Sequence, residues 1–345
     1  MPVVAFLSFR FSDTDGVSVV TKTWRSTFEA LGYETYTVAG VEPADRVVHG
    51  LGIGADTAPD RDQLRDALGD ADLVVVENLA TIPLNLPASR MVGRVLAGRP
   101  AILHHHDPPW HRQDFAHVTE LPLDDPSWRH VSITRTAASE MADRGIGSTV
   151  VRNAFPAAAG GDDMGRRAGV RAELEVGDAD LLVAHPVRAI ERKNIRAAIE
   201  LSERLGAVYW LLGPAEDGYG PTLQTLLADA RCPTRHRPWP DIDGLYAAAD
   251  VIAYPSTWEG FGNPPIEASL RRRPSAVGCY PAATELRTMG FRFFDPTDDP
   301  RIAGFVAEPD EDLLDHNAAL ATEHFSMERL RVDLGALLAD AGWLP

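Results

Sequence analysis

The sequence is poor in cysteine and in long apolar stretches. Its 345 residues include two cysteines, Cys232 and Cys279, which are too few for a disulfide framework, so we expect a reducing compartment. No window holds the roughly 18 uncharged apolar residues that a membrane-spanning helix needs. The first residues carry no basic segment, so no signal peptide is expected. These absences predict a cytoplasmic protein.

Positive charge is also scarce. The chain has 33 basic and 50 acidic residues, which gives a formal net charge of −17. Binding to a nucleic-acid backbone or to an anionic membrane surface depends on basic patches. We therefore expect no nucleic-acid partner and no membrane association.

Lysine is the scarcest of the charged residue types. Of the 33 basic residues, two are lysines, Lys22 and Lys193, and the other 31 are arginines. Such a bias can reflect coding composition alone. A lysine that persists against it is nevertheless a candidate for a role that needs a compact, flexible cation.

Short apolar runs alternate with helical patterns along the whole chain. Runs that read as buried strands cover 3–7, 72–77, 101–103, 131–133, 181–184, 208–213 and 251–254. Patterns that read as helices cover 21–31, 61–69, 88–98, 135–144, 169–174, 195–205, 221–230, 242–249, 265–272 and 326–341. Non-alternating apolar strands between helices predict parallel sheets covered on both faces. The segment 155–180 resembles a linker followed by a short helix. We therefore predict two Rossmann-like α/β domains, at 1–155 and 156–325, with this segment at the start of the second.

The most informative segment, 255–268, reads Pro-Ser-Thr-Trp-Glu-Gly-Phe-Gly-Asn-Pro-Pro-Ile-Glu-Ala. It follows a strand, passes through a glycine-containing loop and opens a helix, an arrangement that suits a phosphate ligand. Glu267, in the first turn of that helix, could accept both hydroxyls of a ribose, and Glu259 could hold sugar hydroxyls. The alternative is a helix-capping Glu267 and a solvated Glu259.

The Glu-x7-Glu spacing in this context resembles the signature of family 4 of the GT-B glycosyltransferases, which are retaining nucleotide-sugar enzymes. Arg188 and Lys193 resemble the family's Arg-x4-Lys pair after a strand, and Gly213 resembles its next strand end. Most of the match lies in residues 180–290. The resemblance implies a GT-B fold, with an N-terminal acceptor domain, a C-terminal nucleotide-sugar domain and a final segment, 326–345, that crosses back to the first domain.

The resemblance also implies site roles in the second half. Arg188 and Lys193 would stabilise the charge that develops on the leaving diphosphate; the alternative is two solvated cations in a turn. His106, Arg188, Lys193 and Glu259 would be the catalytic residues. The residues implied to bind the donor are Gly16, Arg188, Lys193, Gly213, Glu259, Gly260, Phe261, Gly262, Asn263 and Glu267.

In the first half, His106 and Asp107 resemble the family's His-Asp strand end, which implies that His106 contacts the donor sugar. Asp15 stands where the family commonly has a glycine, and is expected on the acceptor side with Asp107 and Trp110. Trp110 could stack on a sugar, or be an ordinary buried aromatic. Within the histidine run 104–106, only the first and third residues can share a strand face. This makes a metal site formed by all three histidines a poor interpretation, and the resemblance to GT-B enzymes implies that no metal and no cofactor is needed.

These observations and the resemblance together predict a retaining, metal-independent hexosyltransferase that uses a UDP- or GDP-linked sugar and a small, soluble hydroxyl acceptor. One alternative is a nucleotide-sugar epimerase on the same fold. Another is an inactive protein that only binds a sugar nucleotide.

Overall fold

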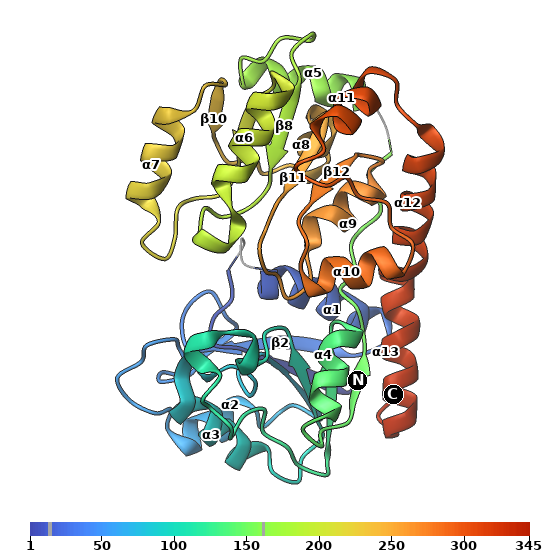
Figure 1. The fold of residues 1–345 in the computed structure, drawn as a ribbon. Coiled ribbons are helices and arrows are strands. Elements are labelled where there is room, and N and C mark those ends of the chain that lie inside the picture. Colours follow the sequence, from blue (N-terminus) through green and yellow to red (C-terminus); the bar gives the residue numbers. More distant parts are fainter. Residues whose placement is uncertain (13–15, 161–162) are drawn as a thin grey trace. The chain divides into compact units, whose positions relative to one another are not determined.

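Two parallel sheets organise the chain in the computed structural model, which describes residues 1–12, 16–160 and 163–345. The chain divides into two units, one of residues 1–155 with 327–345 and one of residues 156–326. Figure 1 labels their elements. The prediction of an α/β protein with parallel sheets is confirmed.

The first unit holds a seven-stranded sheet in the order β3-β2-β1-β4-β5-β6-β7, and all its strand pairs are parallel. Its strands are β1 (Val3–Leu7), β2 (Glu34–Ala39), β3 (Arg46–Val47), β4 (Leu73–Glu77), β5 (Ala101–His105), β6 (Trp128–Ser132) and β7 (Ser148–Val150). Its α-helices are α1 (Gly16–Ala30), α2 (Arg61–Ala67), α3 (Leu86–Leu96), α4 (Arg135–Ala142) and α13 (Met327–Ala341). Short 3-10 helices cover η1 (Pro83–Asn85), η2 (Pro109–His111) and η3 (Gln113–Phe115).

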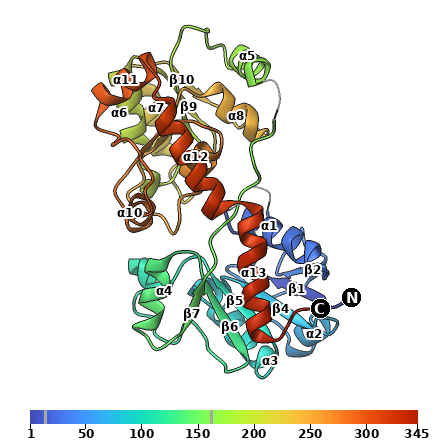
Figure 2. The same cartoon turned by 90° about the vertical axis from the view of Figure 1, so that its right-hand side faces the viewer.

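Both faces of this sheet are buried. Along β1, Val4 and Phe6 enter one apolar cluster, whereas Ala5 and Leu7 enter another. The final helix α13 packs beside α1 (Figure 2), and its buried leucines complete the first of these clusters. These leucines are Leu330, Leu334, Leu337 and Leu338. The last residues of the chain are therefore part of the core of the first unit.

The second unit holds a five-stranded parallel sheet in the order β10-β9-β8-β11-β12. Its strands are β8 (Leu182–His185), β9 (Val208–Leu211), β10 (Thr234–His236), β11 (Val251–Tyr254) and β12 (Ser275–Val277). Its helices are α5 (Asp163–Glu173), η4 (Glu191–Lys193), α6 (Ile195–Leu205), α7 (Gly220–Asp229), α8 (Ile242–Ala248), α9 (Asn263–Leu270), α10 (Pro281–Thr288), α11 (Asp299–Ala307) and α12 (Glu311–Phe325).

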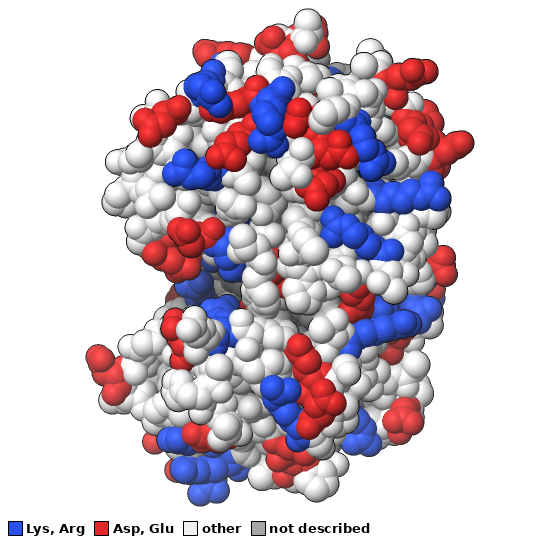
Figure 3. All heavy atoms as spheres, viewed as in Figure 1, with Lys and Arg blue, Asp and Glu red and all other residues white. Residues whose placement is uncertain are grey.

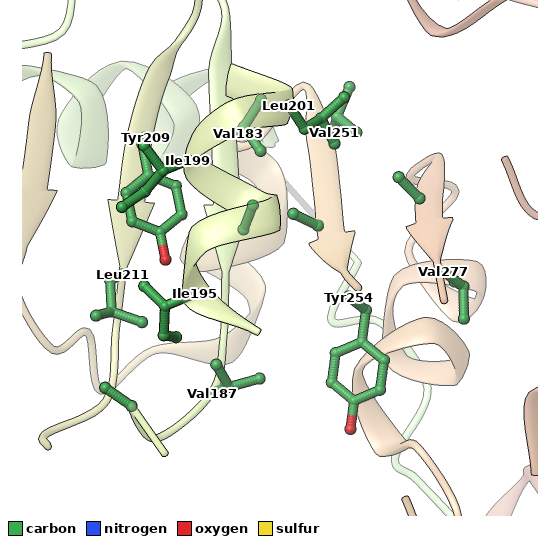
Figure 4. Close-up of a cluster of buried hydrophobic side chains, with 14 of the residues drawn as sticks. Val183, Val187, Ile195, Ile199, Leu201, Tyr209, Leu211, Val251, Tyr254 and Val277 are labelled. Carbon is green, nitrogen blue, oxygen red and sulfur yellow. The ribbon is translucent and has the colours of Figure 1, made fainter. Parts of the chain in front are cut away.

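The core on one face of this sheet is drawn in Figure 4. Tyr209 and Leu211 of β9 point into it, while the alternating residues Val208 and Trp210 enter the cluster on the other face. Tyr254 lies beyond the end of the β11 arrow in the figure, so its hydroxyl reaches the carboxyl edge of the sheet. In open α/β sheets this is the edge where ligands bind.

Acidic and basic side chains are interspersed over the face drawn in Figure 3. None of the helices among the described residues combines the length and the apolar character that crossing a bilayer requires.

Candidate functional site

A group of charged side chains lies in the second unit, where β8 and β11 end. Lys193, the last residue of η4, donates from Nζ to Oε1 of Glu259 at 2.5 Å and to the hydroxyl of Tyr254 at 3.2 Å. Arg192 donates to the other carboxylate oxygen of Glu259 at 2.5 Å. Lys193 and Glu259 are both buried, at 8% and 7% exposed. One carboxylate thus holds two cations in a site largely closed to water.

Burial decides the charge balance of this group. It lowers the pKa of Lys193 to about 8, although the carboxylate of Glu259 acts in the opposite direction. Burial would raise the pKa of Glu259, but Lys193 and Arg192 outweigh it, so the pKa of Glu259 is lowered. Near neutral pH the group therefore carries two positive charges and one negative charge. The excess positive charge suits an anionic ligand.

Arg188, on the loop after β8, has a carboxylate partner of its own. Its Nη1 donates to Oε2 of Glu216 at 2.6 Å, and both side chains are about one-third exposed, at 30% and 35%. The structure thus places Arg188 and Lys193 on the same strand exit, each paired with a different glutamate. Sequence spacing indicated neither pairing, and it gave no role to Arg192, Glu216 or Tyr254.

Two glycines allow close packing in the loops of this edge. A Cβ on Gly213 would lie 2.4 Å from the carbonyl oxygen of Val187 and 2.7 Å from Cα of Arg188. Gly262 has a φ of +105°, and a Cβ there would lie 2.7 Å from the hydroxyl oxygen of Tyr280. The first glycine therefore lets the loop after β9 pack on the backbone that carries Arg188. The second forms the sharp turn into α9.

Helix α9 begins at Asn263, two residues earlier than the sequence pattern predicted. Pro264 and Pro265 thus occupy its first turn, where a backbone N–H has no partner within the helix and proline is tolerated. Glu267 consequently lies in the second turn rather than the first, which corrects the sequence-based expectation. The loop residues Gly260 and Phe261 precede the helix, and Phe261 is buried.

Glu267 belongs to a separate contact. The hydroxyl of Tyr246 donates to its Oε2 at 2.8 Å. Burial raises the pKa of Glu267, and the hydrogen bond from Tyr246 only partly offsets this effect. Glu267 is thus held by a neutral donor, whereas Glu259 is held by two cations.

The first unit contains a second polar group, at the carboxyl ends of β4 and β5. Glu77, the last residue of β4, is fully buried and pairs in register with His104 of β5. Its Oε2 lies 3.0 Å from Nδ1 of His104 and 2.8 Å from Nε2 of His106. The two histidines share a strand face, as their spacing predicted, and Trp24 stacks on the ring of His104 at 4.0 Å.

This buried carboxylate is ionised because of its histidine partners. Burial would raise the pKa of Glu77, but His104 and His106 outweigh it and lower the pKa to about 2. Burial lowers the pKa of His104 to about 4. Donor atoms of the three residues lie within 4.8 Å of one another, so among the described residues this group could hold a metal ion. The 2.8 Å separation between Glu77 Oε2 and His106 Nε2 is that of a hydrogen bond.

His106 is fixed from its backbone as well as from its ring. Asn78, with a φ of 60°, accepts from the backbone N–H groups of His106 and Asp107, both at 3.1 Å. His105 points the other way, and its Nε2 lies 2.8 Å from Nδ1 of His130. His104 and His105 are both fully buried, whereas His106 is 7% exposed.

The remaining residues expected near an acceptor lie on the loop after β5. Asp107 pairs with Arg112 at 2.9 Å. Trp110 donates to Glu140 at 2.8 Å, and the guanidinium of Arg144 covers its ring at 3.7 Å. Trp110 therefore already has a stacking partner in this structure. Gly16 is the exposed first residue of α1.

Asp15 lies outside the described residues, so the expectation of an acceptor contact there has no structural description.

Comparisons with known proteins find sequence relatives and structural neighbours of the chain. No model of a protein family matches the chain. Mannosylglucosylglycerate synthase of Thermotoga maritima is 26% identical over 95% of this chain and 97% of its own length. The chain is thus related in sequence to this glycosyltransferase, and it is similar to GT-B glycosyltransferases of family 4. The resemblance stated from the motifs is therefore confirmed.

Solved structures of this glycosyltransferase fold cover the whole chain. HepE of Anabaena, crystallised with UDP-glucose, has a TM-score of 0.77 at 17% identity and covers 99% of this chain and 100% of its own. Sucrose-phosphate synthase of Thermosynechococcus elongatus has a TM-score of 0.70 at 14% identity, with 99% of both chains covered. These structures show that the chain has this fold; together with the sequence relative from Thermotoga maritima they support a glycosyltransferase that takes its sugar from a nucleotide-sugar donor.

Proposed function

We propose that this glycosyltransferase moves a hexosyl unit from a UDP- or GDP-linked sugar to a hydroxyl of a small, soluble acceptor, with retention of the anomeric configuration. The observation that carries the proposal is the buried group of Lys193, Arg192 and Glu259, beside Arg188, at the strand edge of the second unit. Three cationic side chains, those of Arg188, Arg192 and Lys193, lie at one strand exit, and together they suit a diphosphate.

The donor would replace carboxylates that now hold these cations. Lys193 and Arg188 are paired with Glu259 and Glu216 in the ligand-free chain. A diphosphate offers more negative charge than a carboxylate, and it gains strength from charge-assisted hydrogen bonds in a poorly solvated site. Glu259, once released, is free to accept hydroxyls of the transferred sugar.

The remaining donor contacts in this proposal are those that the resemblance implies. The amino end of α9 directs the partial positive charge of the helix toward phosphate, although Pro264 and Pro265 in its first turn have no N–H to donate. The backbone of the turn before α9 approaches the donor closely. Glu267 accepts hydrogen bonds from the ribose hydroxyls. The turn residues in this role are Gly260, Phe261, Gly262 and Asn263, with Gly213 shaping the neighbouring loop.

The chemical step is a front-face displacement. The bond between the anomeric carbon and the phosphate oxygen breaks, and its electron pair passes to the nucleoside diphosphate. The acceptor oxygen bonds to the same face of the anomeric carbon, and its proton passes to the leaving phosphate. Arg188 and Lys193 stabilise the charge that grows on the phosphate, while His106 contacts the sugar. The resemblance implies Asp107 and Trp110 on the acceptor side, but in this structure they pair with Arg112 and Glu140, so no contact with the acceptor is assigned to them. Gly16, at the start of α1, brings backbone close to the phosphates. No metal or cofactor takes part in the proposal.

The relatives indicate which donors to try first. HepE was crystallised with UDP-glucose, and the Thermotoga maritima relative is named for a product with mannosyl, glucosyl and glycerate parts. UDP-glucose and GDP-mannose are accordingly the first donors to test on this chain.

Release of nucleoside diphosphate from each donor, with and without acceptors, tests the proposal. We expect release that depends on an added acceptor and a new glycoside with the configuration of the donor. Conversion of the donor to another sugar nucleotide in the absence of acceptor would instead establish an epimerase. Binding of donor without any turnover would establish an inactive binding protein.

A further inference from the structure

A cavity of about 340 Å³ opens in the first unit, between the first turns of α1 and the loop after β2. All of its lining residues belong to this unit and to the described part of the chain. Its volume is at the lower end of the range for small-molecule sites. It lies near the carboxyl ends of β1 and β2, on the edge where open α/β sheets bind ligands. No role has been given to it so far.

Two cations from one helix line this cavity. Lys22 and Arg25 stand three residues apart on α1, so they lie on the same face of the helix. Arg25 is held by its Nε, which donates to Thr35 at 3.1 Å, while its Nη2 is 3.9 Å from Asp45. The guanidinium is thus anchored at one end, and among the described residues the carboxylate with which it pairs, that of Asp45, is beyond hydrogen-bond distance.

Hydroxyls and carboxylates line the rest of the cavity. Thr37 donates to Oδ2 of Asp45 from both its backbone nitrogen and its hydroxyl, each at 2.8 Å. These bonds fix the loop and occupy one oxygen of Asp45. Glu42, also in the lining, accepts from the backbone nitrogen of Ala44 at 3.3 Å. Cations suit an anionic group of a ligand, and carboxylates suit its hydroxyls.

We propose that this cavity binds the acceptor, and that the acceptor is a small hydroxy acid: a molecule with hydroxyl groups and one oxyanion group, either carboxylate or phosphate. Arg25 and Lys22 bind the oxyanion, and Glu42 and Asp45 accept the hydroxyls. The assignment as acceptor rests on the proposed function. The binding chemistry is independent of the donor site, which lies in the other unit.

Three three-carbon probes test the proposal on the intact protein: glycerol, D-glycerate and glycerol 3-phosphate, titrated at constant ionic strength in a thermal-shift assay. We expect at least one of the two acids to raise the melting temperature and glycerol to leave it unchanged. The acid with the larger shift distinguishes carboxylate from phosphate. Equal shifts for all three probes, or none for either acid, would overturn the proposal.

Substitutions in the cavity lining test whether the acid binds there. Arg25→Gln should weaken acid binding about ten-fold or more, because it removes a charge-assisted contact. Lys22→Gln should have an effect in the same direction. Arg61→Gln, at an exposed residue outside the lining, serves as the matched control. Arg25→Lys keeps the charge if Arg25→Gln folds poorly. Unchanged acid binding in the Arg25 variants would place the acid elsewhere.

Binding of UDP or GDP to each variant, measured in the same assay, separates the two proposals. Loss of acid binding with intact nucleotide binding supports the cavity assignment. Acid binding that does not stimulate release of nucleoside diphosphate would keep the site but contradict its role as the acceptor site.

Discussion

The lowered pKa of Lys193 predicts a pH dependence of the reaction that can be measured. Burial lowers its pKa to about 8, so the side chain loses its positive charge as the pH rises through that value. A neutral amine cannot stabilise a leaving diphosphate as a cation does. We therefore expect kcat/KM for the donor, which reports the free enzyme, to fall above about pH 8.

Lys193→Arg is the matched variant, since arginine stays charged throughout this range. It should lose the decline near pH 8 while keeping part of the activity. Lys193→Ala should lose roughly 10- to 100-fold in rate, and Arg196→Ala, at an exposed residue on α6, should lose little. The same decline near pH 8 in Lys193→Arg would show that another group titrates.

Glu77 and His106 should act as one unit if the buried carboxylate positions the histidine. Glu77→Gln and His106→Asn are each expected to lower kcat roughly 10- to 100-fold, because a small displacement of a contacting group is costly. The double variant should be little worse than either single variant, since both remove the same interaction. Additive losses in kcat would contradict a shared role. Donor binding serves as the control for folding.

Sequence reasoning found His106 but missed Glu77, and the reason is geometric. Glu77 ends an apolar run that reads as a strand, and its partners follow 27 and 29 residues later. The pairing depends on the register that sets Glu77 opposite His104, which no spacing within one strand encodes. The contact between Arg188 and Glu216 was missed for the same reason, because it joins the loops that follow two neighbouring strands.

At the scale of elements, the packing of the loop after β9 on the loop after β8 should govern the donor site. Gly213→Ala would push a Cβ into the backbone of Val187 and Arg188, and must displace the chain that carries Arg188. We expect a KM for the donor raised about ten-fold or more, together with a loss of stability of roughly 1–3 kcal/mol, as for other overpacked sites.

Gly169→Ala is the control for that change. Gly169 lies within α5 and has no atom within 4 Å of the added Cβ, so alanine there should stabilise the helix by about 0.5–1 kcal/mol. Donor kinetics and urea unfolding of the two variants compare the effects. An unchanged donor KM in Gly213→Ala would show that the loop adjusts without moving Arg188.

Long apolar runs predicted their elements well. Strands β1 and β11 and helix α6 have the bounds that their patterns gave. The sequence pattern missed β2, β3, β7, β10 and β12, and helices α10, α11 and α12. Four of these strands are two or three residues long and too short to show a period, whereas β2, Glu-Thr-Tyr-Thr-Val-Ala, has no continuous apolar run. Helix α5 begins at Asp163 rather than near 169, because its first turns are polar and carry no apolar stripe.

At the scale of the whole molecule, buried neutral histidines should make the protein sensitive to acid. Burial lowers the pKa of His104 to about 4 and of His185 to about 3, and holds the pKa of His105 well below its usual range. Unfolded histidine binds a proton near pH 6.5. Between that pH and the folded values, the unfolded state binds more protons, so stability falls as the pH falls.

Each of these histidines should lower the free energy of unfolding by about 1 kcal/mol between pH 6 and pH 5, and the three together should lower it by about 3 kcal/mol. Urea midpoints measured at pH 7, 6 and 5 check this, with His185→Asn expected to reduce the dependence in the second unit. Midpoints that stay constant from pH 7 to pH 5 would mean that these histidines are not held neutral in the folded chain.

The structure shows where the two lysines of this lysine-poor chain lie. The scarcity of lysine drew attention to Lys193, whereas the sequence indicated only an ordinary helix-surface residue at Lys22. Lys193 lies in the buried charged group of the second unit, and Lys22 lines the cavity of the first. An acidic chain with few basic residues thus places both of its lysines beside proposed sites for anionic ligands.

Proton NMR of a reaction mixture tests the central claim most directly. The mixture contains the enzyme, UDP-glucose or GDP-mannose, and D-glycerate or glycerol 3-phosphate. The account predicts that the anomeric signal of the donor is replaced by that of a glycoside of the same configuration, with one nucleoside diphosphate released for each glycoside. Lys193→Ala should slow this conversion. A product of inverted configuration, or equal rates in the wild type and Lys193→Ala, would contradict the account.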